Sequence, residues 1–383
     1  MAGLRILAAA MRRLNPIESP VARGTDATGR LQALDGLRGL AVAIVVASHL
    51  SNHRMLGNTG MALAGSGKSG VYLFFVLSAF LLTRLLLSLP SGALRRLDTW
   101  IDYALRRVLR IWPLYLLVLL SSWVLGPYLP AWHYRIDTPT LLRHLTLQEG
   151  QSVLWSIPVE FKAYGALPLI VAGVAVLRRF PAMVTAAMFI VSFVLACMFW
   201  PTSRMAVNSV ALGPYLTAFI AGAGVAWLDL QWRARGGPSR AATIVCGAWV
   251  LAALGIWWFT TPLGLSVLRG AAVPADVNHG WIPFFALLWS SALLALLHAG
   301  PRVEALFANR PLRALGWISF SMYLWHMVVI DFWKAAGWPA GPLPAIALVA
   351  CMVLVAAASY RLVERPLQGI RWRRGHTSSL AAG

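Results

Sequence analysis

Long apolar segments recur along the whole chain, and they constrain its fold more than any other feature of the sequence. Each is about 20 residues long, which is the length of helix that crosses the hydrocarbon core of a bilayer. Charged residues make up only 12% of the chain, about half of the share typical of a soluble domain. Because a bilayer offers no water to peptide groups, these segments must be helices that satisfy their own backbone hydrogen bonds. The sequence therefore predicts an all-α, polytopic integral membrane protein.

Hydropathy predicts about ten transmembrane helices within one membrane domain, residues 35–366. Residues 1–34 are expected to form a basic, flexible cytoplasmic tail, and residues 367–383 a short cytoplasmic tail at the other end. The expected spans are 36–52, 69–90, 111–128, 153–177, 182–200, 207–228, 241–259, 281–298, 314–333 and 341–361.

The distribution of basic residues predicts the orientation of these spans. With the N-terminus inside, the cytoplasmic segments hold 25 of the 33 Lys and Arg residues and the outer loops hold 7. Cytoplasmic loops are enriched in these residues, so both termini are expected in the cytoplasm. Residues 91–110 have amphipathic helical spacing and are expected to lie on the inner membrane surface. The net charge is +20, but the basic residues lie between the apolar segments and do not form one face. This distribution favours contact with membrane lipids and argues against a nucleic-acid partner.

The first span carries ionisable residues that are costly inside a membrane. Asp35 and Arg38 stand at its cytoplasmic mouth, and His49 follows eleven residues after Arg38. Eleven residues turn a helix by about three full turns and advance it by about 16 Å, so Arg38 and His49 share one stripe. They are therefore candidates for catalysis or substrate binding. The alternative is that Arg38 anchors the helix at the inner surface and His49 hydrogen-bonds a neighbouring helix.

Arg107 and Arg110 are three residues apart at the entrance to the third span, so they lie on one helical face. Arginine forks recognise phosphates, because their planar donors match the oxygens in pairs. A positive-inside cluster that touches lipid headgroups explains the same residues, and without other evidence it is the favoured interpretation.

Two further polar stripes lie in later spans. Ser156 and Glu160 are four residues apart and share a face, although helix capping and the helix dipole explain both residue types. In the ninth span, Ser319, Tyr323 and His326 follow the i, i+4, i+7 spacing of one helix face. For His326, a hydrogen bond across helices is favoured over a catalytic role.

Six segments, taken together and in this order, resemble the membrane acyltransferase 3 family. The resemblance covers nearly all of residues 31–366. No single motif is decisive, but six in register along ten predicted spans form a specific pattern. The segments are LDGLRGLAVAIVVASH, GVYLFFVLSAFLLT, RRVLRIWPLYLL, LWSIPVEF, LGWISFSMYLWH and YRLVERP.

Family members transfer an acyl group from cytoplasmic acyl-CoA, mostly to carbohydrates of the cell envelope. The resemblance implies a multi-pass acyltransferase of EC class 2.3.1 in the bacterial inner membrane. Acyl-CoA, expected to be acetyl-CoA, would be the donor substrate, with no permanently bound cofactor and no metal. The expected acceptor is a hydroxyl of an extracytoplasmic polysaccharide or lipid-linked glycan. Some relatives acylate macrolides, so a small-molecule acceptor stays open.

By the same resemblance, His49 matches the histidine of the first span and Arg38 the arginine of its motif. Arg107 and Arg110 match an Arg-x-x-Arg element attributed to CoA phosphates, and Glu160 matches the acidic residue of Trp-Ser-x-x-x-Glu.

We expect His49 to act as the general base that takes the proton of the acceptor hydroxyl. Glu160 or Asp35 is expected to orient its imidazole, and an acyl-histidine intermediate is a second possible route. The candidate catalytic residues are His49 and Glu160, and the candidate substrate-binding residues are Asp35, Arg38, Arg107, Arg110, Trp155, Ser156, Tyr323 and His326.

Two classes of protein other than an enzyme also fit these features. A transporter or flippase for envelope precursors would place polar residues at the middle of the membrane. A non-catalytic subunit of envelope assembly would share the fold without the activity.

The basic-residue bias generates a prediction about topology. A reporter protein fused after Gly383 should be active in its cytoplasmic form and inactive in its periplasmic form. The measurement is a paired fusion assay with a cytoplasm-active and a periplasm-active reporter. Activity only in the periplasm would overturn the orientation.

Overall fold

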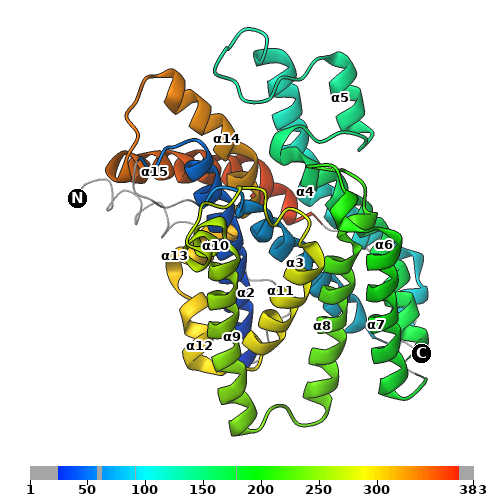
Figure 1. Ribbon diagram of the computed structural model, residues 1–383. Coiled ribbons are helices and arrows are strands. Elements are labelled where there is room, and N and C mark those ends of the chain that lie inside the picture. Colours follow the sequence, from blue (N-terminus) through cyan, green and yellow to red (C-terminus); the bar gives the residue numbers. More distant parts are fainter. Residues whose placement is uncertain (1–24, 58–62, 91, 178, 371–383) are drawn as a thin grey trace.

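The computed structural model describes residues 25–370, except 58–62, 91 and 178. All regular elements in these residues are helices, and no strand occurs among them (Figure 1). This confirms the predicted all-α class. The predicted tails lie largely outside the described residues, at 1–24 and 371–383. Helix α2 begins at Thr25, so residues 25–34 of the expected N-terminal tail are helical.

The helices follow one another along the chain with short connections. In order they are α2 (Thr25–Asn52), α3 (Gly67–Leu87), η1 (Ala93–Arg95), α4 (Leu97–Leu125), α5 (Thr138–Leu145), η2 (Ser152–Trp155), α6 (Ser156–Leu177), α7 (Ala182–Phe199), η3 (Thr202–Arg204), η4 (Gly213–Tyr215), α8 (Leu216–Ala234), α9 (Arg240–Thr260), α10 (Pro262–Arg269), α11 (Ile282–Leu296), α12 (Pro301–Phe307), α13 (Arg310–Trp317), α14 (Ser319–Ala335), α15 (Pro342–Ser359), the π-helical turn η5 (Tyr360–Glu364) and α16 (Arg365–Gln368).

Helices occupy the positions of all ten predicted spans, but they differ in length. In the described part of the chain, seven helices are long and apolar enough to cross a membrane. An eighth span results if α13 and α14, which meet at an angle of 79°, are counted together. Helix α11 is apolar but only 15 residues long. The helices are those of a multi-pass membrane protein, while the number of ten and the side of the termini stay predictions.

The amphipathic segment is continuous with the span that follows it. From Leu97 onward, residues 91–110 belong to α4, which continues without a break to Leu125. The helix is 29 residues long and contains Pro113. Among its residues 97–110 only Tyr103 is buried, so the position of this segment on the inner membrane surface stays a prediction.

Helices α2 and α3 form the centre of the bundle, and α5 projects at its edge (Figure 1). In their apolar segments 67% of α2 and 72% of α3 is buried, against 11% of α7. Helix α2 packs against α3, α12, α13 and α14. The residues of α2 that the sequence singles out are therefore surrounded by protein.

The crossing between α2 and α13 depends on glycine. A Cβ atom on Gly39 would collide with the backbone carbonyl of Leu312, and one on Gly316 would collide with the carbonyl of Asp35. Gly36 meets the carbonyl of Phe307 in the same way. Small residues let helix backbones approach closely in membrane proteins, where packing and not water expulsion drives association. The glycines of the LDGLRG motif thus set how close α2 lies to α12 and α13.

Gly39→Ala should destabilise the protein by about 1–3 kcal/mol, because the added methyl group forces apart two packed backbones. The measurement is thermal unfolding of the purified protein in detergent. Gly165→Ala is the matched control, since its Cβ would point into open space and Gly costs about 1 kcal/mol relative to Ala in a helix. Equal stability of the two variants would contradict the close crossing.

Candidate active site

His49 and His326 meet in the centre of the bundle. Nε2 of His326 lies 3.3 Å from Nδ1 of His49, and the ring centroids are 4.9 Å apart. His326 is completely buried on α14, and His49 is one of the last residues of α2. The hydrogen bond across helices that the sequence favoured for His326 is present. Its partner, which the sequence did not indicate, is the candidate base.

The hydrogen-bond partners assign the tautomers of both rings. Nδ1 of His49 lies 2.9 Å from the carbonyl oxygen of Val45, and Nδ1 of His326 lies 2.8 Å from that of Tyr323. A carbonyl oxygen only accepts, so in each neutral ring Nδ1 carries the hydrogen and Nε2 is the acceptor. Nδ1–H of His49 is then shared between Val45 and Nε2 of His326. Nε2 of His49 keeps a free lone pair, which is the requirement for a general base.

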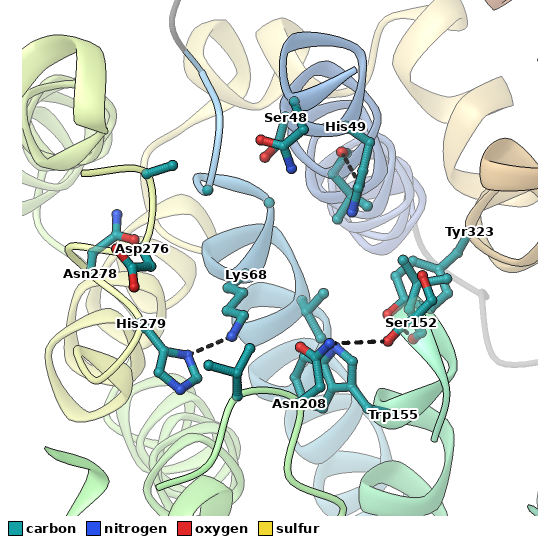
Figure 2. Close-up of a pocket in the computed structure, with 18 residues that line it drawn as sticks. Ser48, His49, Lys68, Ser152, Trp155, Asn208, Asp276, Asn278, His279 and Tyr323 are labelled. Carbon is teal, nitrogen blue, oxygen red and sulfur yellow. Dashed lines mark hydrogen bonds between the residues drawn. The ribbon is translucent and has the colours of Figure 1, made fainter. Parts of the chain in front are cut away.

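His49 lines a cavity of about 290 Å³ (Figure 2). One wall is strongly polar: Lys68 donates to Nδ1 of His279 at 2.5 Å, and Asp276 lies beside them. Burial, and secondarily the neighbouring Lys68 ammonium, lower the pKa of His279. The imidazole is therefore neutral, and its Nδ1 accepts a hydrogen bond from Lys68. The remaining wall carries Ser48, Asn52, Ser152, Trp155, Asn208, Asn278 and Tyr323.

A second, smaller cavity of about 40 Å³ adjoins the first and contains the predicted arginines Arg38 and Arg110. Glu160 and Ser156 also line it, so the sequence-derived candidates of four helices meet there. Val71 and Tyr323 belong to the linings of both cavities. The basic cavity and the histidine cavity are therefore neighbours, separated by these side chains.

Tyr323 and Ser156 are hydrogen-bonded to each other at this boundary. The Ser156 hydroxyl donates to the Tyr323 oxygen at 2.9 Å, and the Tyr323 hydroxyl donates to the carbonyl of Val153 at 2.6 Å. Trp155 stacks on Tyr215 with ring centroids 5.1 Å apart and faces the histidine cavity. These predicted binding residues thus form the shared wall of the two cavities.

The expected partners of His49 lie elsewhere. Glu160 accepts from Ser78 at 2.7 Å and from the Tyr164 hydroxyl, whereas Asp35 accepts from Trp317 at 3.2 Å. Among the described residues neither carboxylate hydrogen-bonds His49. The expectation that one of them orients the imidazole is therefore wrong in this structure. Glu160 lines the cavity of Arg38 and Arg110, and Asp35 lies three residues before Arg38 on α2, whereas His49 lines the neighbouring cavity.

Arg107 and Arg110 do not share a cavity, although they share a helix face. Arg107 stacks on the ring of Tyr164 at 5.8 Å and lines a wider groove of about 670 Å³. Arg96 and Arg106 line the same groove, and Arg106 is paired with Asp102 at 2.5 Å. Arg107 and Arg110, the two residues predicted to bind phosphates, thus line two different cavities along α4.

The sequence did not single out the polar cavity wall. Lys68 could have been recognised from the sequence, because it is a lone cation at the edge of a predicted span. His279 and Ser152 lie in predicted loops and Asn208 at the start of a predicted span, and only the packing of these three segments brings them to the cavity.

Two O-acetyltransferases are similar to this chain over most of its length. The peptidoglycan O-acetyltransferase OatA of Listeria monocytogenes is 22% identical over 396 residues, which cover 88% of this chain and 55% of the relative. The O-acetyltransferase OatA of Staphylococcus aureus is 25% identical over 366 residues, 88% of this chain and 57% of the relative. The chain thus spans little more than half the length of these relatives. No solved structure matches the chain.

The family assignment rests on the membrane helices themselves. Residues 31–361 match the acyltransferase 3 family, described as an acyltransferase domain. This range runs from the first turns of α2 to the beginning of η5, and it includes the residues of both cavities and both histidines. The chain therefore belongs to the acyltransferase 3 family.

Proposed function

We propose that the protein transfers an acetyl group from cytoplasmic acetyl-CoA, through the bundle, to a hydroxyl of an envelope polysaccharide outside the inner membrane. The observation that carries this proposal is that the arginine cavity and the histidine cavity share Val71 and Tyr323, while the groove that contains Arg107 lies further along the same helices α3 and α4. The O-acetyltransferase names of the relatives support the acetyl group and the glycan acceptor.

The donor would bind from the side of the arginines. The groove lined by Arg96, Arg106 and Arg107 is wide enough for a nucleotide, and it opens near the predicted inner surface. Arg38 and Arg110 lie deeper, in the small cavity beside Tyr323. Guanidinium groups pair with phosphate oxygens, and a narrow pantetheine arm suits the passage towards His49. Side-chain movement at Val71 and Tyr323 would join the two cavities.

His49 would act as the general base for the acceptor hydroxyl. His49 lines the cavity, its Nδ1–H is held by Val45 and His326, and its Nε2 has no hydrogen-bond partner among the described residues. His326 is a positioning residue in this scheme, because its own Nδ1–H is fixed by backbone carbonyls and its Nε2 can only accept. The imidazole of His49 is thereby kept in the tautomer that can take a proton.

The acceptor would occupy the polar half of the histidine cavity. Lys68, Asp276 and Asn208 offer a donor, an acceptor and an amide, a mixture that suits a hydroxyl-rich ligand. Trp155 adds an aromatic face, on which sugar rings pack. The same wall would also exclude a purely apolar substrate, because its polar groups would lose water without gaining partners.

Arg110→Ala should weaken binding of acetyl-CoA by about tenfold or more, since a charged hydrogen bond contributes about 1.5–3 kcal/mol. Arg110→Lys should restore only part of the affinity, because an ammonium cannot form the paired contact. The measurement is calorimetric titration of the purified protein with acetyl-CoA.

Arg302→Ala is the matched control for this titration. Arg302 is exposed in α12 and lies in a predicted cytoplasmic segment, so its loss should leave acetyl-CoA binding unchanged. If Arg110→Ala binds as tightly as Arg302→Ala, the arginine cavity is not a donor site and Arg110 is an anchor at the lipid headgroups.

His49→Gln should reduce acetyl transfer by about 10²–10⁴-fold, because an amide keeps the size of the side chain but cannot take a proton. Binding of acetyl-CoA should persist, since Arg38 and Arg110 remain. The measurement is transfer from acetyl-CoA to peptidoglycan fragments and neutral oligosaccharides in reconstituted vesicles.

His53→Gln is the control for the same assay, because His53 lies four residues further along and is only half-buried. It should transfer at the parental rate. Near-parental transfer by His49→Gln would remove the base from this mechanism. Absence of transfer by the parent with every thioester donor would instead favour a transporter.

A further inference from the structure

Three side chains from distant parts of the sequence form a hydrogen-bonded row beside His49. Nδ1 of His133 lies 2.7 Å from Oδ2 of Asp331, and Nε2 of His133 lies 2.8 Å from the hydroxyl of Ser152. His133 belongs to the loop between α4 and α5, Ser152 begins η2, and Asp331 belongs to α14. The row is carboxylate, imidazole and hydroxyl.

The partners fix the direction of each hydrogen bond. A carboxylate accepts, so Nδ1 of His133 carries the hydrogen and Nε2 is left to accept from the Ser152 hydroxyl. A serine whose proton points at an imidazole, which a carboxylate in turn orients, is the arrangement that activates a nucleophile. It recurs on unrelated folds and is recognised by geometry and not by sequence order.

Ser152 is also held in an uncommon backbone conformation. Its φ is +51°, in the left-handed region that residues other than glycine rarely adopt. Such strain persists only where surrounding contacts enforce it, and it concentrates at functional sites. Here the Asn208 amide donates to the Ser152 carbonyl at 3.4 Å (Figure 2). The conformation presents the hydroxyl to His133.

Ser152 can be reached by a substrate. It lines the same cavity as His49, and none of the three members of the row is fully buried. The exposed fractions of the His133 and Asp331 side chains are 14% and 26%. A purely structural row would tie the same three segments together, but it would not require Ser152 to line the cavity of His49.

We propose that Ser152 is a nucleophile that carries the acyl group between donor and acceptor, activated by His133 and Asp331. This inference rests on the proposed acyl transfer and adds a covalent acyl-serine to it. Ser152 and His133 would be catalytic residues, and Asp331 a positioning residue.

In the first step, the Ser152 oxygen attacks the thioester carbonyl of the donor and its proton passes to Nε2 of His133. The tetrahedral adduct collapses, the carbon–sulfur bond breaks, and CoA leaves as a thiolate. The products are an ester on Ser152 and a protonated His133, which the Asp331 carboxylate stabilises at 2.7 Å.

In the second step, an acceptor hydroxyl attacks the ester carbonyl and gives its proton to Nε2 of His49. The bond between the acyl carbon and the Ser152 oxygen breaks, and that oxygen recovers a proton from His133. The acceptor ester leaves, and the proton on His49 returns to the thiolate or to water. The imidazole of His133, which is hydrogen-bonded to Ser152, and the imidazole of His49, which lines the cavity, thus serve the two half-reactions.

Nucleophilicity of Ser152 can be tested without any donor. A fluorophosphonate probe should label the purified full chain on the peptide that contains Ser152, as detected by mass spectrometry. His133→Gln and Asp331→Asn should lower the labelling rate by about 10²-fold or more, because the hydroxyl then lacks an oriented base. Ser152→Gly removes the hydroxyl and tolerates the positive φ, so its loss of labelling cannot be attributed to misfolding.

Ser291→Ala is the matched control, since its hydroxyl donates to the carbonyl of Leu288 in its own helix. It should be labelled like the parent. Labelling of the folded parent no faster than that of Ser152→Gly would overturn the nucleophile and leave the row as a structural element.

Incubation with acetyl-CoA distinguishes a failure of the acyl-serine from a failure of the proposed acetyl transfer. Incubated without acceptor, the parent should gain one acetyl group on Ser152, and His49→Gln should accumulate this ester because its release is blocked. Undiminished transfer by Ser152→Gly would overturn the acyl-serine and leave direct transfer by His49. Fluorophosphonate labelling of Ser152 without acetylation by acetyl-CoA would keep the nucleophile and contradict the proposed donor.

Discussion

The close crossing of α2 with α13 is the constraint on which the site depends. Gly36 and Gly39 of α2 and Gly316 of α13 allow backbones to touch where any Cβ would collide with a carbonyl. Helix α14 follows α13 after a sharp bend, so the same crossing sets its distance from α2. His49 and His326 meet only because their helices are held this close. The spacing of the site thus comes from residues that carry no chemistry.

Polar groups inside this bundle are arranged by depth. Arg38, Arg110 and Glu160 share one cavity, while His49 shares the next with Lys68 and with the loop residues Asn208, Asp276 and His279. Tyr323 belongs to both linings. A buried polar group is costly unless it is hydrogen-bonded, and these side chains find their partners across helices. The order from arginines to imidazole to hydroxyl groups is the order in which a donor from one side would meet an acceptor from the other.

Much of the candidate site followed from local sequence. Arg38 and His49, which the eleven-residue spacing assigns to one stripe, line two neighbouring cavities, and Ser156 and Tyr323 are hydrogen-bonded to each other at the boundary. Two features lay beyond the reach of local sequence. Glu160 does not hydrogen-bond His49, and Arg107 and Arg110 line different cavities. Both depend on which neighbours cover a given helix face.

By itself, the sequence determined the helical class, the position of the helices and the stripe that carries His49. These follow from the length of apolar runs and from helical periodicity, both of which are local. Only the tertiary structure decided that His326 holds His49, and that His133, Ser152 and Asp331 form one row. Those three residues are separated by as many as 198 positions. Contacts at such separation depend on how whole helices pack, and no periodicity within one segment encodes them.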